Sequence, residues 1–334
     1  MNIEYVIFLS TTVTFLITIY ILPRLVKKMV NSDICGVDVN KISKPKIPEM
    51  GGMAGVLGFT LGTTFVLGII KFYSYIDETP VLVSISVICI ASLIGLLDDI
   101  SILGRKEKAW FISLAALPLI ISQIGSENVN LLFFSLNFEN YNLLYWLFLV
   151  PFGVTCCANA LNMSAGYNGL ESGQFVIISF TLLILAILDG VSLSIVIIYS
   201  SVFGSCLALF HYNKYPSKIF LGDIATLGFG SLIAACVVMS GHIFYGVICI
   251  TPTFYELYST IKYKIKGIER RDACMNPILL ENGIIKPSEG SEDYTLAFLL
   301  LSYKDLNERQ LTNLILMIYS FFSFVAIILF YLFN

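Results

Sequence analysis

Long apolar stretches constrain this chain more than any other feature of its sequence. Ten of them can be read along the 334 residues, at roughly 4–26, 50–72, 80–97, 109–123, 143–164, 173–188, 191–212, 220–239, 242–262 and 312–333. About 20 apolar residues in a helix are enough to cross a bilayer. With 57% apolar and 13% charged residues, the composition is not that of a soluble domain. The sequence therefore predicts an all-α polytopic membrane protein with about ten transmembrane helices.

The basic residues predict how these helices are oriented. With ten spans, 19 of the 20 Lys and Arg residues fall on one side of the membrane, and only Lys71 falls on the other. The positive-inside rule makes the basic side cytoplasmic and puts both termini outside. We therefore expect a multi-pass protein of the cell membrane, or of the endoplasmic reticulum membrane in a eukaryote, with a cytoplasmic active site.

The chain contains no stretch that predicts a separate soluble domain. We expect residues 1–334 to form one integral membrane domain. The longest polar stretch, residues 263–311, precedes the last apolar segment. It is expected to be a cytoplasmic loop or cap.

Four polar clusters lie on the predicted cytoplasmic side, and the first is VDVNKISKPKIPEMGG, residues 37–52. It combines Asp38 with several lysines and ends in a Gly-Gly helix start, and helix N-termini attract phosphate. Taken alone, it could be a charged loop that follows the positive-inside rule. Glu49 favours a functional reading, because it is an acid directly at the membrane boundary.

The second cluster is LLDDISILGRKEK, at the end of an apolar segment. Asp98 and Asp99 are followed by Arg105, Lys106 and Lys108. Mg²⁺ binds through few carboxylates and leaves positions for substrate oxygens, and lysine offers a movable charge to phosphate. The alternative is that the two acids only cap a helix at the interface.

The third cluster, NALNMSAGYNGLESGQ, also ends an apolar segment, and the fourth is FLGDIATLGFG. In a continuous helix, Asn159, Asn162 and Gly166 would share one face and form a polar groove that lipid would not tolerate. The glycines could instead serve close helix packing. Asp223 enters an apolar segment behind a glycine, and an intramembrane acid is a functional candidate by default.

Together the clusters predict a membrane-level site with three carboxylates, two amides and many cations. This combination suits divalent-metal phosphoryl transfer. The sequence has no P-loop, Rossmann glycine pattern or Ser-His-Asp arrangement. We expect no nucleic-acid partner.

In their order and spacing, the clusters resemble those of the polyprenyl-phosphate sugar-1-phosphate transferases, glycosyltransferase family 4. The motifs DVNK, IPE, LLDD, NALNMSAGYNGLE and FLGD resemble the dolichol branch, the UDP-GlcNAc:dolichyl-phosphate GlcNAc-1-phosphate transferases, in an archaeal-like form. The bacterial branch carries aspartates where this chain has Asn168 and Glu171. The resemblance implies transfer of GlcNAc-1-phosphate from UDP-GlcNAc to dolichyl phosphate with release of UMP, the first step of lipid-linked oligosaccharide assembly for protein N-glycosylation.

The resemblance also implies roles for individual residues. Mg²⁺, with Mn²⁺ as the alternative ion, would be held by Asn162 and Asp223. The catalytic carboxylates would be Asp98, Asp99 and Asp223. The lipid phosphate would meet Lys108, Thr155, Asn159, Asn162 and Met163. The UDP-sugar would meet Val37, Asp38, Val39, Glu49, Asn168, Glu269, Arg270 and Arg271.

The chain departs from the dolichol branch in two places. Glu269, Arg270 and Arg271 stand where that branch has a basic Arg-His-Arg type motif, and Ile102 and Arg105 replace an Asn and a Trp typical of eukaryotic members. A related N-acetylated sugar is therefore an alternative donor. Two alternative hypotheses for the function are a bacterial-type transferase that uses undecaprenyl phosphate and a transporter or flippase. The chain could also form a homodimer.

Overall fold

The computed structural model describes residues 2–101, 104–268, 277–288, 290–291 and 293–333, and helices dominate it. Eight helical stretches in this part of the chain are long and apolar enough to cross a membrane. They are α1 (Ile3–Asn31), α2 (Gly52–Lys71), α3 (Thr79–Ser101), a stretch from Glu139 to Met163, α8 (Leu170–Asp189), α9 (Leu193–Asn213), α10 (Asp223–Ser240) and α15 (Glu308–Phe333). The stretch from Glu139 comprises η2 (Glu139–Tyr141), α6 (Asn142–Leu144), the π-helical η3 (Tyr145–Leu149) and α7 (Val150–Met163). The predicted class, an all-α polytopic membrane protein, is confirmed.

The other two predicted segments are helical but interrupted. Residues 109–123 fall in α4 (Arg105–Ser113), η1 (Leu114–Ala116) and α5 (Leu117–Ser122), and residues 242–262 fall in α11 (Ile243–Cys249), η4 (Thr251–Thr253) and α12 (Phe254–Ile265). Pro118 and Pro252 lie at these interruptions. Proline has no N–H to donate and its ring clashes with the preceding turn, so an apolar run that contains it need not form one straight helix.

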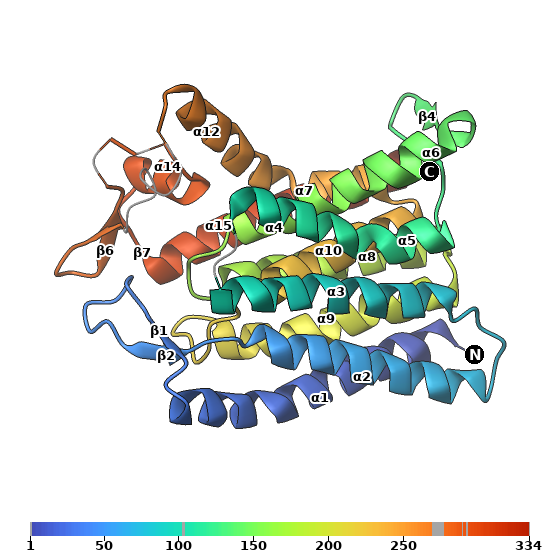
Figure 1. Ribbon diagram of the computed structural model, residues 1–334, viewed down its shortest axis with the longest axis horizontal. Helices are drawn as coiled ribbons and strands as arrows, with labels where there is room; N and C mark the ends of the chain where they lie inside the picture. The colour runs from blue at the N-terminus through green and yellow to red at the C-terminus, as the bar shows by residue number, and fades with distance from the viewer. Residues whose placement is uncertain (1, 102–103, 269–276, 289, 292, 334) are drawn as a thin grey trace.

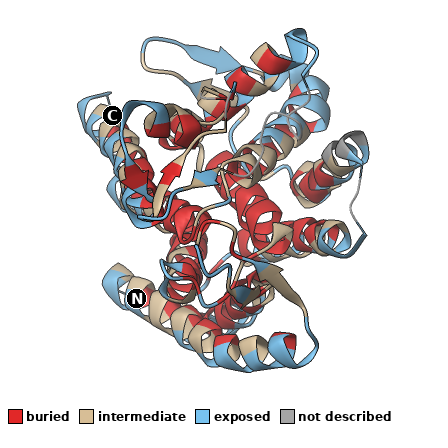
Figure 2. Cartoon of the chain, turned by 90° about the vertical axis from the view of Figure 1, so that its left-hand side faces the viewer, coloured by how far each residue is buried: buried red, intermediate tan, exposed pale blue. Residues whose placement is uncertain are grey.

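Helix α10 lies at the centre of the bundle. It packs against α3 on one side and α7 on another, and α8 packs against α9 and α15. Small residues allow this close approach: a Cβ on Gly95 would lie 2.4 Å from the carbonyl oxygen of Asp223, and one on Gly230 would lie 2.8 Å from the Cα of Ala158. In Figure 2 the buried residues accordingly gather on the inner helices, while the outer helices α1 and α15 expose one face.

The helices run side by side along the long axis of the molecule, so the chain has two distinct ends (Figure 1). One end carries the hairpin of β1 (Cys35–Val37) and β2 (Lys46–Pro48), the helix α14 (Leu296–Tyr303) and the small sheet of β5 (Ile278–Leu279), β6 (Ile284–Lys286) and β7 (Leu306–Asn307). The other end carries the start of α1, the end of α15 and the hairpin of β3 (Asn128–Asn130) and β4 (Ser135–Asn137). Both ends of the chain thus lie on the same side of the bundle, as an even number of crossings requires.

Candidate active site

Four predicted site residues meet at the end of the bundle that carries β1 and β2. Asp98 lies in the last turn of α3, Lys108 in α4 and Asn162 in the last turn of α7, and Asp223 begins α10. The ammonium of Lys108 lies 2.7 Å from Asp98 Oδ2 and 3.5 Å from Asn162 Oδ1, and it also pairs with Asp223 Oδ2. We call these four residues the Lys108 cluster. Three helix ends and the short helix α4 therefore bring together side chains that are up to 125 positions apart in the sequence.

The charges of the Lys108 cluster depend on one another. Burial disfavours the charged ammonium of Lys108, but Asp223 and Asp98 outweigh this effect and raise its pKa above the ordinary value. Asn162 Nδ2 donates to Asp223 Oδ1 at 2.6 Å and to Thr226 Oγ1 at 2.8 Å. The orientation of Asp223 is thus fixed by a cation on one oxygen and an amide on the other.

Asp99 is next to Asp98 in sequence but binds backbone N–H groups of α10. Its Oδ1 accepts a hydrogen bond from the backbone N–H of Asp223 at 3.0 Å, and its Oδ2 accepts one from Ile224 at 3.4 Å. A carboxylate on the first N–H groups of a helix stabilises the helix N-terminus. Asp99 therefore holds the start of α10 in place beneath the Lys108 cluster.

The amides of α7 do not share one polar face. Asn162 points to Asp223, whereas Thr155, Asn159 and Met163 line an apolar groove. The predicted continuation of the helix to Gly166 is wrong, because α7 ends at Met163 and Gly166 adopts a φ of +130° in the following turn. Successive helix residues are about 100° apart, so two asparagines three positions apart can serve two adjacent surfaces.

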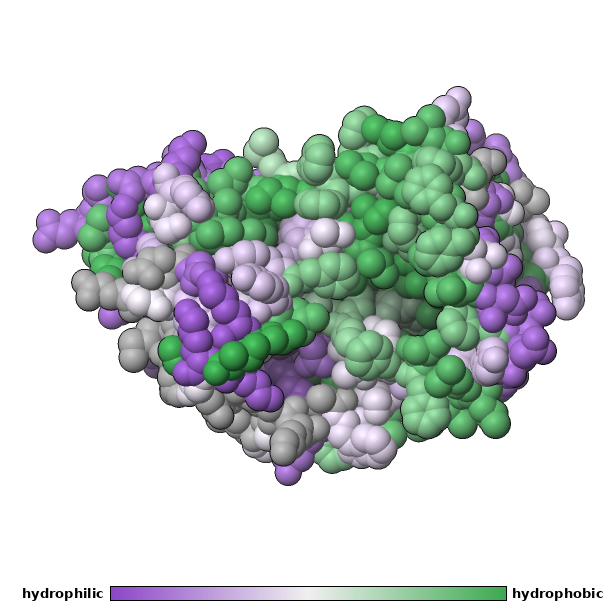
Figure 3. Space-filling model, turned by 90° about the horizontal axis from the view of Figure 1, so that it is seen from above, coloured by the Kyte–Doolittle hydropathy of each residue, from purple (hydrophilic) through white to green (hydrophobic). Residues whose placement is uncertain are grey.

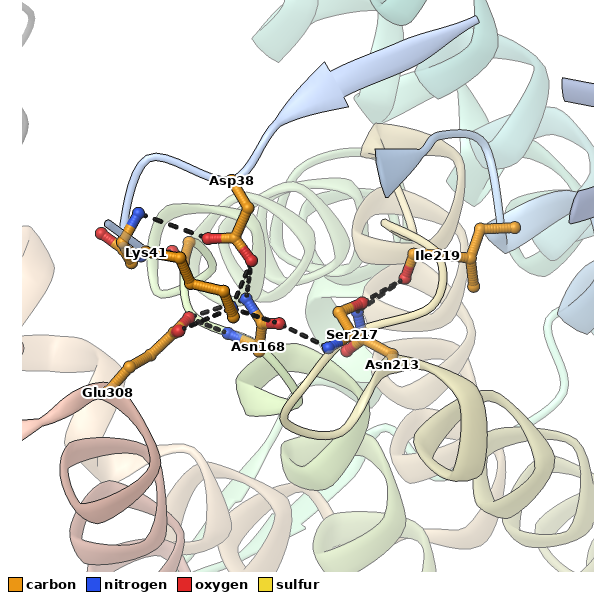
Figure 4. Close-up of polar contacts among 9 residues, drawn as sticks. Asp38, Lys41, Asn168, Asn213, Ser217, Ile219 and Glu308 are labelled. Carbon is orange, nitrogen blue, oxygen red and sulfur yellow. Dashed lines mark hydrogen bonds and ion pairs between the residues drawn. The ribbon is translucent and has the colours of Figure 1, made fainter. Parts of the chain in front are cut away.

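A second polar group, the Lys41 cluster, comprises the side chains of Asp38, Lys41, Asn168 and Glu308 and the backbone N–H of Ser217 (Figure 4). Lys41 Nζ pairs with Asp38 and lies 3.0 Å from both Asn168 Oδ1 and Glu308 Oε2. The amide of Asn168 donates to Asp38 Oδ2 at 3.1 Å and to Glu308 Oε1 at 2.7 Å, and its oxygen accepts from the Ser217 N–H at 2.6 Å. Asp38, Asn168 and Glu308 are all buried, so these hydrogen bonds and ion pairs lie in the interior of the protein.

The remaining predicted residues for the UDP-sugar are distributed around this end. Val37 is exposed on β1, and Val39 lies two residues after the end of this strand. The Glu49 carboxylate lies close to Gly36 on β1. Glu269, Arg270 and Arg271 lie outside the described residues.

The sequence did not single out Glu308, Thr226 or Ser217. Glu308 carries the clearest signal that was available, because it is an acid at the start of a long apolar segment, as Glu49 is. Thr226 and Ser217 carry no such signal, since hydroxyl residues are common in membrane helices and turns.

A long apolar groove runs along α7, the helix whose last turn carries Asn162 of the Lys108 cluster. It is about 680 Å³ in volume and is lined by α7, α10, α11, the start of α12 and the β3–β4 hairpin. Figure 3 shows a hollow bordered by hydrophobic side chains on this face of the molecule. At its polar end the groove is lined by Asn159 and Met163, which flank Asn162 on the last turns of α7. The polar cluster and the apolar groove are thus neighbours along the last turns of α7.

The donor atoms fit a magnesium ion that is shared with a substrate. Oxygens of Asp98, Asp223 and Asn162 already converge on one cation, the ammonium of Lys108. Among the described residues, no three His, Cys, Asp or Glu side chains are grouped so that they could hold a metal by themselves. Mg²⁺ commonly takes only one or two carboxylates and completes its shell with substrate phosphates and water. Asn162 and Asp223 can supply such a partial set.

Comparisons with known proteins point to one family. A model of glycosyl transferase family 4 matches residues 81–241, which include all four residues of the Lys108 cluster. A Methanocaldococcus jannaschii protein named as a glycosyltransferase is 31% identical over 325 residues, 97% of this chain and 96% of the relative.

Two further relatives carry more specific names. A Saccharolobus solfataricus protein named as a UDP-N-acetylglucosamine–dolichyl-phosphate N-acetylglucosaminephosphotransferase is 31% identical over 264 residues, 78% of this chain and 79% of the relative. The phospho-N-acetylmuramoyl-pentapeptide-transferase of Streptococcus mutans is 28% identical over 245 residues, 67% of this chain and 69% of the relative. The resemblance read from the motifs is confirmed: this chain is a multi-pass membrane protein of glycosyl transferase family 4.

Proposed function

We propose that this enzyme transfers GlcNAc-1-phosphate, or a related N-acetylated sugar-1-phosphate, from a UDP-sugar to dolichyl phosphate and releases UMP. One observation carries the proposal: α7 supplies Asn162 to a cluster of carboxylates, amide and ammonium, and its neighbours Asn159 and Met163 to an apolar groove. A substrate with a phosphate head and a prenyl tail matches both parts. The names of the archaeal relatives support the same donor and acceptor.

In this reaction an oxygen of the lipid phosphate attacks the phosphorus that carries the sugar. The new P–O bond forms the lipid diphosphate, and the P–O bond to UMP breaks. Lys108 would bind the lipid phosphate with its ammonium, and Asp98 would hold that ammonium in position. A magnesium ion held by Asn162 and Asp223 would neutralise charge on the diphosphate. Asp99 would keep Asp223 in position through the backbone of α10.

The donor is proposed to bind near the Lys41 cluster, where Asp38 and Asn168 lie together. Val37, Val39 and Glu49 are proposed to contact the UDP-sugar from the β1–β2 side, and Glu269, Arg270 and Arg271 from residues 263–311, proposed to be a cap of this single domain. The strongly basic side of the chain supports a cytoplasmic location for this end in the cell membrane. The product would be the first intermediate of a lipid-linked oligosaccharide for protein N-glycosylation.

A second candidate is the same reaction on undecaprenyl phosphate. It is supported by the streptococcal relatives, whose matches cover about two thirds of this chain. These relatives are less similar than the archaeal ones, so dolichyl phosphate is the preferred acceptor. Family membership argues against the transporter reading.

The proposal is tested with purified protein in detergent, Mg²⁺ and a panel of UDP-sugars and prenyl phosphates, with UMP release as the measurement. We expect release that requires both metal and lipid phosphate and is fastest with UDP-GlcNAc and dolichyl phosphate. Faster turnover with undecaprenyl phosphate in direct competition would favour the second candidate. Release without a lipid acceptor, or none with any pair, would contradict the proposed transferase.

A glycine substitution tests the proposed link between Asp99 and α10. Gly222 has a φ of +73°, and a Cβ there would lie 2.5 Å from Asp99 Oδ2, whereas Gly190 has a φ of +66° with no atom within 4 Å. Gly190→Ala should lose about 1 kcal/mol of stability, because Gly190 is in the left-handed helical region. Gly222→Ala should lose more, because its ψ of 176° places Gly222 in a region that only glycine adopts readily. Only Gly222→Ala should also lose most of its UMP release, because the methyl group displaces the carboxylate. Equal activities of the two variants, after correction for the folded fraction, would contradict this.

A further inference from the structure

At the end away from the Lys108 cluster, the β3–β4 hairpin forms a wall of the apolar groove. There the lining comes from Val129 on β3, Leu136 on β4 and Phe138 just after β4. Val129 and Leu136 are directly paired across the hairpin, so their side chains lie on the same face of it, and both line the groove. The hairpin therefore presents a small apolar surface to whatever occupies the groove.

This wall is held in place by several contacts with the segment that leads into α7. Glu127 accepts hydrogen bonds from the Trp146 indole at 2.8 Å and from the Asn142 amide at 2.5 Å. The Tyr145 hydroxyl donates to the Ser126 carbonyl at 3.0 Å, and Tyr145 and Trp146 are almost completely buried. Because its base is anchored in this way, the hairpin forms a fixed boundary of the groove.

The wall lies well away from the reacting groups. Helix α7 lines the groove from Val150, at its start, to Met163, which directly follows Asn162 of the Lys108 cluster. At 1.5 Å per residue these 13 steps correspond to about 20 Å. Figure 1 likewise shows β4 at the opposite end of the bundle from β1 and β2. The hairpin therefore makes no direct contact with the reacting groups, whereas a ligand that extends along the groove can reach both.

We infer that the β3–β4 hairpin is a specificity element for the prenyl chain of the lipid acceptor, with Val129 and Leu136 as the contact residues. This inference rests on the proposed function. A prenyl chain that reaches the hairpin gains apolar contact with both residues, and a shorter chain does not. A chain longer than the groove turns away at the hairpin into the bilayer, so added length beyond that point brings no further gain. The groove is lined almost entirely by apolar residues, and it reaches Asn159 and Met163, which flank Asn162 of the Lys108 cluster on α7. These two features favour the acceptor's own chain as the occupant.

The test measures kcat/KM for UMP release with prenyl phosphates of increasing length and one fixed UDP-sugar. For the unaltered enzyme we expect kcat/KM to rise with length and then to level off. The doubly substituted variant Val129→Ala, Leu136→Ala should lose about tenfold with long acceptors and nothing with the shortest acceptor that turns over. The unchanged rate with that short acceptor also shows that the variant is folded.

The matched control is Phe134→Ala, because Phe134 lies on the same hairpin but is 60% exposed and does not line the groove. It should keep the length dependence of the unaltered enzyme. Equal losses with short and long acceptors in the double variant, or an unchanged ratio between them, would overturn the inference while the transferase activity stands. Absence of UMP release from the unaltered enzyme with every acceptor would instead overturn the proposed function.

Discussion

Replacing Asp223 with Asn should lower kcat for UMP release by about 10³-fold, an effect of the size seen when one essential electrostatic group is removed from an active site. The substitution keeps the size of the side chain and an oxygen for the hydrogen bond from Asn162. It removes the negative charge that faces Lys108 and that would hold Mg²⁺. The loss should therefore appear in kcat, and raising the Mg²⁺ concentration should recover part of it.

The control for this variant is Asp305→Asn. Asp305 also pairs with a lysine, Lys286, at the end of the bundle that carries β6 and β7, but its side chain is 60% exposed. Exposed pairs contribute little, so its activity should stay within about twofold of the unaltered enzyme. If Asp223→Asn retained most of its activity over a range of Mg²⁺ concentrations, the proposed role of Asp223 would be wrong.

The membrane fold could be predicted from sequence because hydropathy and helix length are local properties. Eight predicted segments became long helices for this reason. The interruptions around Pro118 and Pro252 were harder to predict from sequence, since proline is tolerated in many membrane helices and its effect depends on neighbouring packing. The path of α12 away from the bundle in Figure 1 could not be read from the apolar run alone.

The site could be predicted as a set of residues but not as a geometry. Asp98 and Asp99 are adjacent in sequence, yet one pairs with Lys108 and the other binds the N-terminus of α10. Neighbouring residues on a helix point about 100° apart, so their roles were set by what packs on each side. The sequence pattern does not contain that information.

The Lys41 cluster was even harder to predict from sequence, because Lys41 and Glu308 are 267 positions apart. Asp38 and Asn168 were predicted to act together only through the family resemblance. Their common partner, Glu308, depends on where α15 docks against α8, and no local signal reports such a contact. Sequence therefore predicted most of the chemical groups at this end of the bundle but not the cation that joins them.

Lys108→Ala should lower kcat by about 10²–10³-fold, because it removes the cation on which Asp98 and Asp223 converge. Without the ammonium, the two carboxylates repel each other and the lipid phosphate. A short primary amine such as ethylamine should restore part of the activity by supplying a cation in the space left by the side chain. Rescue by the amine would separate loss of the charge from a general loss of folding.

The pH dependence gives a second check on Lys108. Its pKa is raised in the folded protein, so the charge is fully present below the ordinary lysine value and is lost only as the pH rises through the higher folded value. The unaltered enzyme should therefore show no titration of this group between about pH 6 and pH 9.

The matched control for Lys108→Ala is Lys46→Ala, because Lys46 pairs with Asp33 at the same end of the bundle but is 66% exposed. A loss of activity in Lys46→Ala as large as that in Lys108→Ala would show that the effect reflects the overall positive charge of this end and not the Lys108 cluster.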